Sequence, residues 1–236
     1  MGGAGHGAGP MPASAWSERV PTLIINPNST VAMTEAMVIA ARAAVPWHGF
    51  EGWTSHNGPP AIQGAADGVR AAPPLLELVD KAAREGAEGI VIGCFDDTAL
   101  AEAAARVVGP VVGLGQAAFH ACALRQWRFS VVTTLSVSIP VIEGNIARYG
   151  LAGHLGRVRA SEVPVLELDR APEKATAPIL AEAERAVRED EIDAIVLGCA
   201  GMVHVTAALR AALPVPVIDP VEAAAGTIAM LGALAA

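Results

Sequence analysis

Two cysteines in similar surroundings are the residues of this chain best suited to chemistry. Cys94 follows the apolar run Ile90-Val91-Ile92 and a glycine, and Cys199 follows Ile195-Val196-Leu197 and a glycine. A thiolate is a base and a nucleophile, so two thiols that face one carbon atom can take a proton from one side and return a proton to the other. We therefore expect a catalytic pair, Cys94 and Cys199. The alternative is that each is a small buried apolar residue.

The similarity continues beyond the cysteines themselves. The cysteines lie 199 − 94 = 105 positions apart. Pro110, within Gly-Pro-Val-Val-Gly, and Pro216, within Val-Pro-Val-Ile-Asp, lie 216 − 110 = 106 positions apart. A match that slips by one residue over such a length indicates an internal duplication. Each half of the chain therefore contributes one cysteine at the end of a buried strand.

Short apolar runs alternate with helical segments along the chain. The runs are continuously apolar, which is typical of parallel strands covered on both faces. We predict an α/β fold of two pseudo-symmetric α/β domains with parallel-strand sheets and an active-site cleft between them. Residues 21–115 with 216–236 form the first predicted domain, and residues 116–215 form the second. Ligands of such sheets bind at the carboxyl ends of the strands, where Asn26, Thr133, Thr134 and both cysteines stand.

Two further patterns are better explained by structure than by chemistry. Asp96 and Asp97 can act as an acid and base pair, but they are better placed to cap the helix expected at 98–107. Gly113-Leu114-Gly115 imitates a dinucleotide-binding loop, yet no acidic residue follows about twenty positions later to hold a ribose. The histidines fall in no metal-binding spacing, and no Cys-x-x-Cys pair supplies ligands. We therefore expect no metal, no nucleotide and no other cofactor.

Composition narrows the class of partner. The chain has 236 residues, 53% of them hydrophobic and 17% charged, which suffices for a packed core. A net charge of −8 with interspersed signs argues against nucleic acid and anionic membranes and leaves a small-molecule substrate as the expected partner. Residues 1–20 lack the pattern of a secretory signal and are predicted to be a disordered tail. Three cysteines without such a signal indicate a reducing, cytoplasmic location.

Five stretches resemble a known family of enzymes. They are Leu23–Thr30 (LIINPNST), Gly93–Asp97 (GCFDD), Phe129–Leu135 (FSVVTTL), Ile195–Met202 (IVLGCAGM) and Pro216–Val221 (PVIDPV). Together they resemble the hydantoin racemases, which belong with allantoin racemase to the aspartate/glutamate racemase superfamily, and the likeness extends over about residues 21 to 230. The resemblance implies a cofactor-independent racemase of two pseudo-symmetric α/β domains, commonly a homo-oligomer. It also implies that Cys94 and Cys199 are the two catalytic thiols.

The residues after each cysteine depart from the amino-acid racemases of that superfamily. Those enzymes typically carry Asn-Thr after the first cysteine and Thr-Glu after the second, whereas Phe95-Asp96 and Ala200-Gly201 stand here. The departure favours an uncharged ring, a 5-substituted hydantoin or allantoin, over a free amino acid. Three alternatives stay open: an Asp/Glu-type amino-acid racemase, a maleate isomerase, and an arylmalonate-type decarboxylase, although the last keeps only the second cysteine. A two-lobed binding protein without chemistry is a further class.

Racemisation by two thiols places requirements on the site. One thiol must ionise while the other keeps its proton, and an ordinary cysteine pKa of about 8.5 leaves little thiolate at neutral pH. We expect a lowered pKa, with a helix N-terminus and backbone N–H groups supplying about 2 kcal/mol. The enolate oxygen also needs hydrogen-bond donors. The candidates are the backbone N–H groups after each cysteine, at Phe95, Asp96, Ala200 and Gly201, with Asn26 and Thr133 or Thr134.

Overall fold

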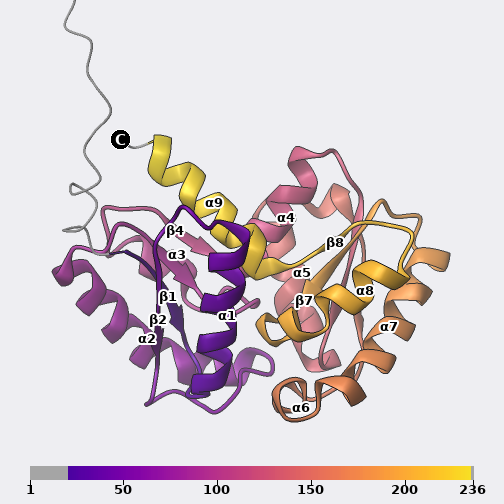
Figure 1. Cartoon of the computed structure of the whole chain (residues 1–236), viewed down its shortest axis with the longest axis horizontal. Coiled ribbons are helices and arrows are strands. Elements are labelled where there is room, and N and C mark those ends of the chain that lie inside the picture. The colour runs from indigo at the N-terminus through magenta and orange to yellow at the C-terminus, as the bar shows by residue number, and fades with distance from the viewer. Residues whose placement is uncertain (1–20, 235–236) are drawn as a thin grey trace, which may run out of the picture.

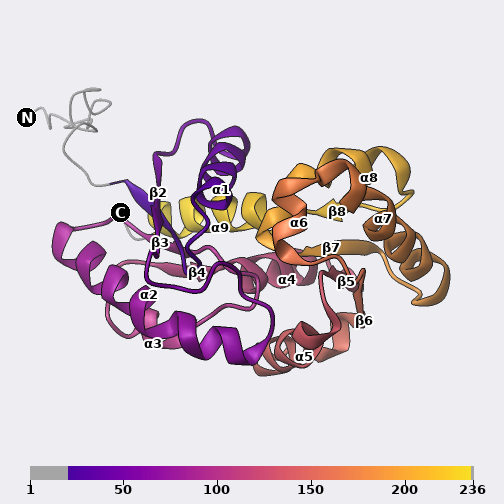
Figure 2. The same ribbon diagram turned by 90° about the horizontal axis from the view of Figure 1, so that it is seen from below.

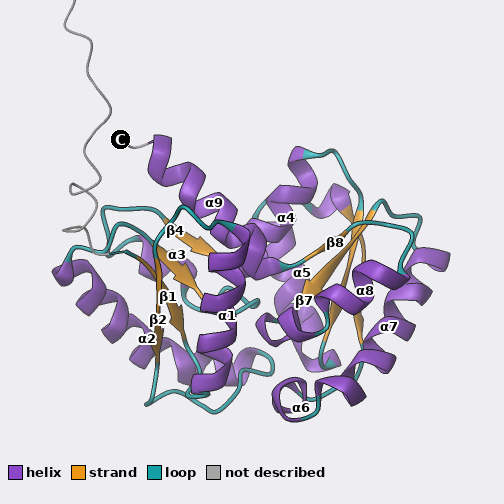
Figure 3. Ribbon diagram, in the orientation of Figure 1, coloured by secondary structure: helices purple, strands orange, loops and turns teal. Residues whose placement is uncertain are grey.

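The strands form two sheets of the same design (Figure 3). The computed structural model describes residues 21–234, so the predicted tail at 1–20 lies outside the described residues. The strands of the first sheet are β1 (Thr22–Asn26), β2 (Phe50–Thr54), β3 (Ile90–Ile92) and β4 (Val111–Gly113). The strands of the second sheet are β5 (Phe129–Thr133), β6 (Leu155–Ala160), β7 (Ala194–Gly198) and β8 (Val217–Ile218).

Strand order is the same in the two sheets. The orders are β2-β1-β3-β4 and β6-β5-β7-β8, and every pairing is parallel. Each half thus places its second strand at one edge, then its first, third and fourth strands, which confirms the predicted α/β fold with two parallel sheets. Every residue of β1, β5 and β7 is buried. Burial on both faces explains why these strands are continuously apolar instead of alternating.

Helices cover both faces of each sheet (Figures 1 and 2). The outer faces pack against α2 (Ala65–Glu85) and α3 (Leu100–Ala104) in the first half, and against α7 (Pro172–Glu189) and α8 (Thr206–Ala212) in the second. Between the two sheets lie α1 (Val31–Ala44), α4 (Leu114–Leu124), α5 (Ile139–Arg148) and α9 (Pro220–Leu234). Shorter segments are α6 (Val165–Arg170) and the 3-10 turns η2 (Ser136–Ser138), η3 (Ala152–His154) and η4 (Ala200–His204). No helix within residues 21–234 has both the length and the apolar character needed to cross a membrane.

One apolar core runs between the two sheets. It contains side chains from the inner faces of both, among them Val91 of β3 and Val196 of β7. Phe119 of α4 stacks on Phe129 of β5, with ring centroids 5.5 Å apart, and meets Phe95 edge-on at 5.4 Å. Aromatic pairs of this kind add to the free energy of burial. Because Phe95 directly follows the first cysteine, the shared core fixes the loop that carries that cysteine.

Helix α2 begins earlier than its sequence suggests. Two prolines make a start near Pro74 the natural prediction, because proline lacks the N–H that a helix interior needs. The helix instead starts at Ala65 and contains both Pro73 and Pro74. Its buried stripe, Ala71 with Leu75, Val79 and Ala82, already begins before the prolines. Packing of that stripe on the sheet holds the helix together across the two missing donors.

The end of the chain belongs to both halves. The sequence assigns residues 216–236 to the first domain, but β8 pairs with β7 and so forms an edge of the second sheet. Helix α9 then returns to the first half, where it contacts α1, β3 and β4, and it also packs against α4. The assignment of β8 to the first domain is therefore corrected, because the strand pairing of the duplicated unit is completed by its fourth strand. The remaining domain boundaries stay a prediction.

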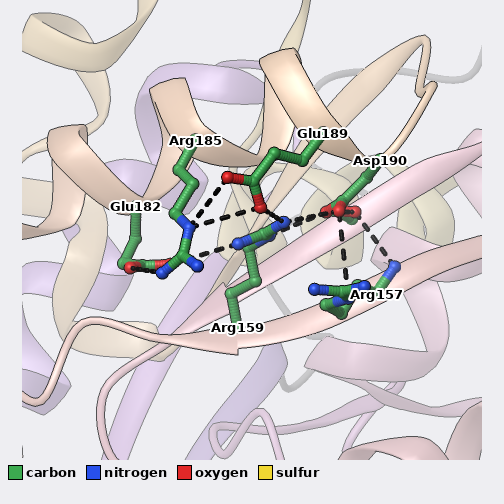
Figure 4. A network of polar contacts seen from close by, with 7 residues as sticks. Arg157, Arg159, Glu182, Arg185, Glu189 and Asp190 are labelled. Atoms are coloured by element: carbon green, nitrogen blue, oxygen red, sulfur yellow. Dashed lines mark hydrogen bonds and ion pairs between the residues drawn. The ribbon is translucent and has the colours of Figure 1, made fainter.

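A buried ion-pair network joins β6 to the end of α7 (Figure 4). The Arg159 side chain is 4% exposed and the Asp190 side chain 1% exposed. Arg159 Nη2 lies 2.6 Å from Asp190 Oδ1 and Arg159 Nε lies 2.8 Å from Asp190 Oδ2, while Nη2 also reaches Glu189 Oε2 at 2.8 Å. Ser130 of β5 donates to Asp190 Oδ2 at 2.7 Å. Burial acts to raise the pKa of Asp190, but the hydrogen bonds from Arg159 and Ser130 outweigh it and lower that pKa.

Candidate active site

Both cysteines line one pocket, at the carboxyl ends of equivalent strands. Cys94 follows β3 and Cys199 follows β7, and each strand is the third of its half. The pocket is therefore built from both halves of the duplicated chain. Its free volume is about 30 Å³, which is room for about one water molecule. The lining residues are Asn28, Met33, Ile62, Gly93, Cys94, Phe95, Asp96, Thr133, Thr134, Ser138, Val165, Gly198, Cys199, Ala200 and Gly201.

Cys94 is surrounded by polar groups of its own loop. Thr98 Oγ1 lies 3.4 Å from Cys94 Sγ, and the backbone N–H of Asp96 also donates to this sulfur. Burial nevertheless raises the pKa of the Cys94 thiol, and the charge of Asp96 raises it further. The charge of Cys199 acts on Cys94 in the same direction. The two thiols and the carboxyl group therefore share one electrostatic environment.

Cys199 has a similar environment built from the second half. The backbone N–H groups of Gly201 and Met202, in η4, donate to its sulfur. Burial raises the pKa of this thiol to about 12, and the charge of Asp96 also acts to raise it. The lowered thiol pKa expected from the sequence is thus wrong for this structure. Of the predicted backbone donors, Asp96 and Gly201 reach the sulfurs, Met202 is an additional donor, and the loss of hydration around each sulfur outweighs them.

Asp97 caps a helix, but not the helix that follows it. Its carboxylate accepts the backbone N–H of Gly115 at 3.0 Å and that of Gln116 at 2.8 Å, in the first turn of α4. Tyr149, the residue directly after α5, donates a hydrogen bond from its hydroxyl group to Asp97 Oδ2 at 2.8 Å. Helix α3, which the sequence expects Asp96 or Asp97 to cap, has no side-chain cap. The expected cap is therefore wrong as to the helix, because tertiary packing brings α4 closer to this carboxylate.

The same carboxylate explains the glycines that imitate a dinucleotide-binding loop. A Cβ atom added to Gly113 would collide with Asp97 Oδ1, and one added to Gly115 would press on the backbone carbonyl of Phe95 and on Asp97 Oδ2. The helix N-terminus that a phosphate would need already binds a carboxylate. The glycine spacing therefore serves close packing inside the protein.

Asp96 lies in the pocket and lacks the partners that Asp97 has. Its Oδ2 atom is buried and has no hydrogen-bond partner among the described residues. Its backbone carbonyl accepts Nδ2 of Asn145 at 2.8 Å, which fixes the position of the residue. Burial raises the pKa of the Asp96 carboxyl group to about 7. No lysine, arginine or histidine is among the residues that line the pocket.

The amide group on the β1 side of the pocket is Asn28, not Asn26. Asn26 is fully buried, and its Nδ2 lies 3.0 Å from both Asn28 Oδ1 and Thr34 Oγ1. Its Oδ1 accepts the backbone N–H of Asn28 at 3.1 Å. The Asn28 amide nitrogen, 3.6 Å from Met33 Sδ, belongs to a residue that lines the pocket. Asn26 therefore positions Asn28, and the Asn-Pro-Asn turn that contains both was the signal available in the sequence.

Three hydroxyl groups come from the end of β5 and the turn after it. Thr133 and Thr134 both line the pocket, as their place at a strand end predicts. The Thr133 hydroxyl donates to the backbone carbonyl of Gly198 at 3.0 Å, so it serves to join β5 to β7. Thr134 and Ser138 make no side-chain hydrogen bond to another described residue and stay available to a ligand. Sequence reasoning missed Ser138, although it stands where a helix begins beyond a strand end.

An apolar contact between the halves closes one side of the pocket. Met33 and Ala61 of the first half pack with Val165 of the second, next to Cys199. The backbone N–H of Val165 donates to Gln63 Oε1 at 3.1 Å across the same gap. These contacts join the two halves of the chain beside Cys199. Sequence reasoning missed this cluster because it depends on segments about a hundred positions apart.

Nothing in the pocket resembles a metal centre. Within residues 21–234, no group of three or more His, Cys, Asp or Glu side chains is placed to hold a metal ion. His204, the histidine that follows Cys199 in sequence, is not among the lining residues, and its Nε2 lies 3.9 Å from Asp169 Oδ1. Independence from metals and other cofactors stays a prediction.

Known proteins share both the sequence and the fold of this chain. The family model described as Asp/Glu/hydantoin racemase matches residues 23–228. A hydantoin racemase of Rhizobium meliloti is 41% identical over 212 residues, which cover 89% of this chain and 88% of the relative. A solved allantoin racemase of Klebsiella pneumoniae is 36% identical with a TM-score of 0.85, covering 92% of this chain and 89% of that one. Another, of Pseudomonas fluorescens, is 31% identical with a TM-score of 0.86, covering 91% of each chain.

Proposed function

The chain belongs to the Asp/Glu/hydantoin racemase family and is an isomerase, and from this premise we propose that it interconverts the enantiomers of a 5-substituted hydantoin or of allantoin. The observation that carries the proposal is the pairing of Cys94 and Cys199 at equivalent strand ends in one pocket. The Rhizobium meliloti relative is a hydantoin racemase, and the two solved structures more than 30% identical to this chain that are described above are allantoin racemases.

The reaction proceeds by proton transfer at C5 of the ring. The thiolate of one cysteine takes the C5 proton, and the electron pair moves onto the neighbouring carbonyl oxygen to form an enolate. The thiol of the other cysteine then gives its proton to the opposite face of C5, and the carbonyl is restored. The first sulfur ends as a thiol and the second as a thiolate, so the substrate of opposite hand starts from the exchanged state.

The partly buried position of the two thiols suits a carbon acid. A thiol with a raised pKa yields little thiolate, but the thiolate that forms is a stronger base than one in water. Backbone N–H groups at Asp96 and Gly201 stabilise the thiolate form of Cys94 and Cys199, respectively. The Asn28 amide and the hydroxyls of Thr134 and Ser138 line the same pocket and are candidates to donate to the enolate oxygen.

The charge of the pocket supports an uncharged substrate. It contains the Asp96 carboxyl group and no cationic side chain among its lining residues. A second carboxylate in such a pocket is disfavoured, because like charges in a poorly hydrated site repel strongly. Aspartate, glutamate, maleate and arylmalonates all carry carboxylates. The pocket is therefore better suited to an uncharged hydantoin or allantoin ring than to those carboxylate substrates.

Polarimetry with purified protein tests the proposal. Single enantiomers of several 5-substituted hydantoins and of allantoin should lose their optical rotation, whereas aspartate and glutamate should keep theirs. Maleate is achiral, so its conversion to fumarate is followed by NMR instead and should not occur. Protein dialysed against a chelator and assayed in plain buffer with a reductant should keep its activity, since we propose that no metal, nucleotide or pyridoxal cofactor takes part. We also propose a homo-oligomer, which light scattering measures directly. Racemisation of amino acids instead of ring substrates would reject the proposed substrate class.

A further inference from the structure

The Asp96 carboxyl group is an acceptor without a donor. Among the described residues, the buried side-chain oxygen or nitrogen atoms that lack a partner are Ser55 Oγ and Asp96 Oδ2. A buried polar atom without a hydrogen bond costs free energy, and a buried carboxylate without a counter-charge costs more. Asp97, one position later, has three donors. The missing partner of Asp96 is therefore a feature of the pocket and not of this loop in general.

Asp96 is also close to the point where the chemistry takes place. Its charge acts on the sulfur of Cys94 and on that of Cys199. In the proposed reaction the two sulfurs approach one carbon atom from opposite sides. Asp96 lines the same pocket as both cysteines, so its carboxyl group is placed to reach an atom bonded to that carbon. In a hydantoin ring those atoms are the carbonyl carbon, the ring nitrogen N1 and the first atom of the 5-substituent.

We propose that Asp96 is a specificity-determining residue that accepts a hydrogen bond from the substrate N–H next to the reacting carbon. The inference rests on the proposed function and names the chemical feature that the site selects, a ureide N–H on the atom bonded to C5. A carboxylate oxygen accepts such a bond, whereas the neighbouring carbonyl oxygen would be repelled by it. The amide and hydroxyl donors at Asn28, Thr134 and Ser138 suit that carbonyl oxygen instead.

The charge of Asp96 opposes formation of the thiolate that the reaction needs. This effect distinguishes a role in substrate binding from a purely structural role of Asp96. The charged or titratable groups that act on or face Asp96 are Cys94, Cys199 and Asp97, and all of them are acids. An ionised Asp96 disfavours a nearby thiolate, so removal of its charge should favour thiolate formation. The same removal should weaken substrate binding. The substitution should therefore raise KM strongly without a matching loss of kcat. Substitution of a residue that only supports the loop would instead impair substrate binding and kcat together, or change neither.

The test compares three ligands and three variants. The ligands are one 5-substituted hydantoin, its N1-methyl derivative and its N3-methyl derivative, with binding measured by calorimetry and racemisation by polarimetry. Asp96→Leu has a similar size and no acceptor, and Asp96→Asn keeps an acceptor oxygen. Ser138→Ala removes another polar group of the same pocket and should leave the preference for N1–H unchanged. Because Oδ2 has no partner, thermal unfolding of both Asp96 variants should occur no lower than in the wild type.

The expected result is a preference that depends on the carboxyl group. Wild-type protein should favour the N1–H ligand over the N1-methyl ligand by about 10- to 100-fold, the range expected for a hydrogen bond to a charged group. Asp96→Leu should lose most of that ratio, and Asp96→Asn should recover part of it. The N3-methyl ligand should behave like the parent in every protein.

Three outcomes overturn the inference: Asp96→Leu keeps the wild-type ratio, the wild type shows no preference, or the wild type binds none of the ligands. If the wild type binds with an Asp96-dependent preference but does not racemise, the inference stands and the proposed function fails. If it racemises without that preference, the proposed function stands and the inference fails.

Discussion

Two regions of this protein bury acidic groups, and they do so in opposite ways. In the network on β6 and α7, each oxygen of Asp190 meets the Arg159 guanidinium, and the pKa of Asp190 is lowered. In the pocket between the sheets, Asp96 has a buried oxygen without a partner, and its pKa is raised to about 7. Both thiols beside it have raised pKa values as well.

The difference indicates a structural role for the ion-pair network and a chemical role for the pocket. A buried charge that is fully paired holds two elements in one arrangement, and removal of one partner is strongly destabilising. Acidic groups buried without compensation are instead typical of sites where a reaction or a ligand uses them. The network therefore contributes to folding, and the pocket keeps reactive groups at the expense of stability. Four predictions test this division, from the largest expected effect to the smallest.

Replacement of either thiol should have the largest effect. Cys94→Ser and Cys199→Ser should each lower the racemisation rate by about 10²- to 10⁴-fold, the usual contribution of a general acid or base. Each variant keeps one thiol and should still exchange the C5 hydrogen of one enantiomer with deuterium from solvent, as followed by NMR. The two variants should prefer opposite enantiomers, with the double variant as the control for spontaneous exchange. If both variants exchange the same enantiomer, or if one of them racemises the substrate at the wild-type rate, the two-base mechanism is contradicted.

Removal of the Arg159 guanidinium should lower the stability of the protein without changing the racemisation rate of the folded enzyme. Arg159→Met leaves Asp190 buried without its counter-charge and should lower the free energy of unfolding by about 3–5 kcal/mol, measured with urea. Arg185→Met is the matched control, because that side chain is 53% exposed and its loss should change stability by about 0.5 kcal/mol or less. The rate per folded molecule should stay near wild type in both. A specific loss of activity in folded Arg159→Met protein would break the division between the two regions.

The two regions should also respond to pH with opposite signs. The pKa of Asp96 in the folded protein, about 7, is above its value of about 3.9 in an unfolded chain. Between those values the folded state holds more protons, so stability falls as pH rises, by at most about 1.4 kcal/mol per pH unit for one group. Asp96→Asn should flatten this slope, although Asp97, with a pKa also raised by burial to about 7, should leave a remainder. Asp190 contributes the reverse, because its stabilisation is present above its unfolded pKa and is lost as pH falls through its lowered folded pKa.

Urea unfolding of the wild type, Asp96→Asn and Arg159→Met measures both slopes, the Asp96 slope between its unfolded and folded pKa values and the Asp190 slope at lower pH, below its unfolded pKa. A steeper slope in Asp96→Asn than in the wild type would show that Asp96 is paired in solution.

The smallest effect concerns the ease of thiol ionisation. Because the charge of Asp96 raises the pKa of both thiols, Asp96→Asn should let iodoacetamide modify Cys94 and Cys199 at lower pH than in the wild type. Mass spectrometry of the separated peptides assigns the modification, and fully buried Cys122 serves as the internal control. A shift toward higher pH, or a shift confined to one cysteine, would contradict a carboxyl group that acts on both.

Much of the fold follows from the sequence alone. The duplicated motifs, with cysteines 105 positions apart, correspond to two sheets with the same strand order. Continuous apolar runs identify the buried strands, because a strand covered on both faces must be apolar at every position. Those runs also place Cys94 and Cys199 at strand ends, but the two strands belong to different sheets, and the packing of the two halves brings the cysteines to one pocket. The early start of α2 and the place of β8 do not follow, because both depend on packing against distant segments.

The roles of neighbouring polar residues were decided only by tertiary structure. Asp96 and Asp97 are identical and adjacent in the sequence, yet one caps α4 from eighteen positions away and the other faces the pocket unpaired. Asn26 and Asn28 divide in the same manner into a positioning residue and a lining residue. The pattern of apolar residues depends on neighbouring positions in the chain, so it can be recognised from the sequence alone. The partners of a polar group, and with them the sign of its pKa shift, depend on which elements the fold packs around it.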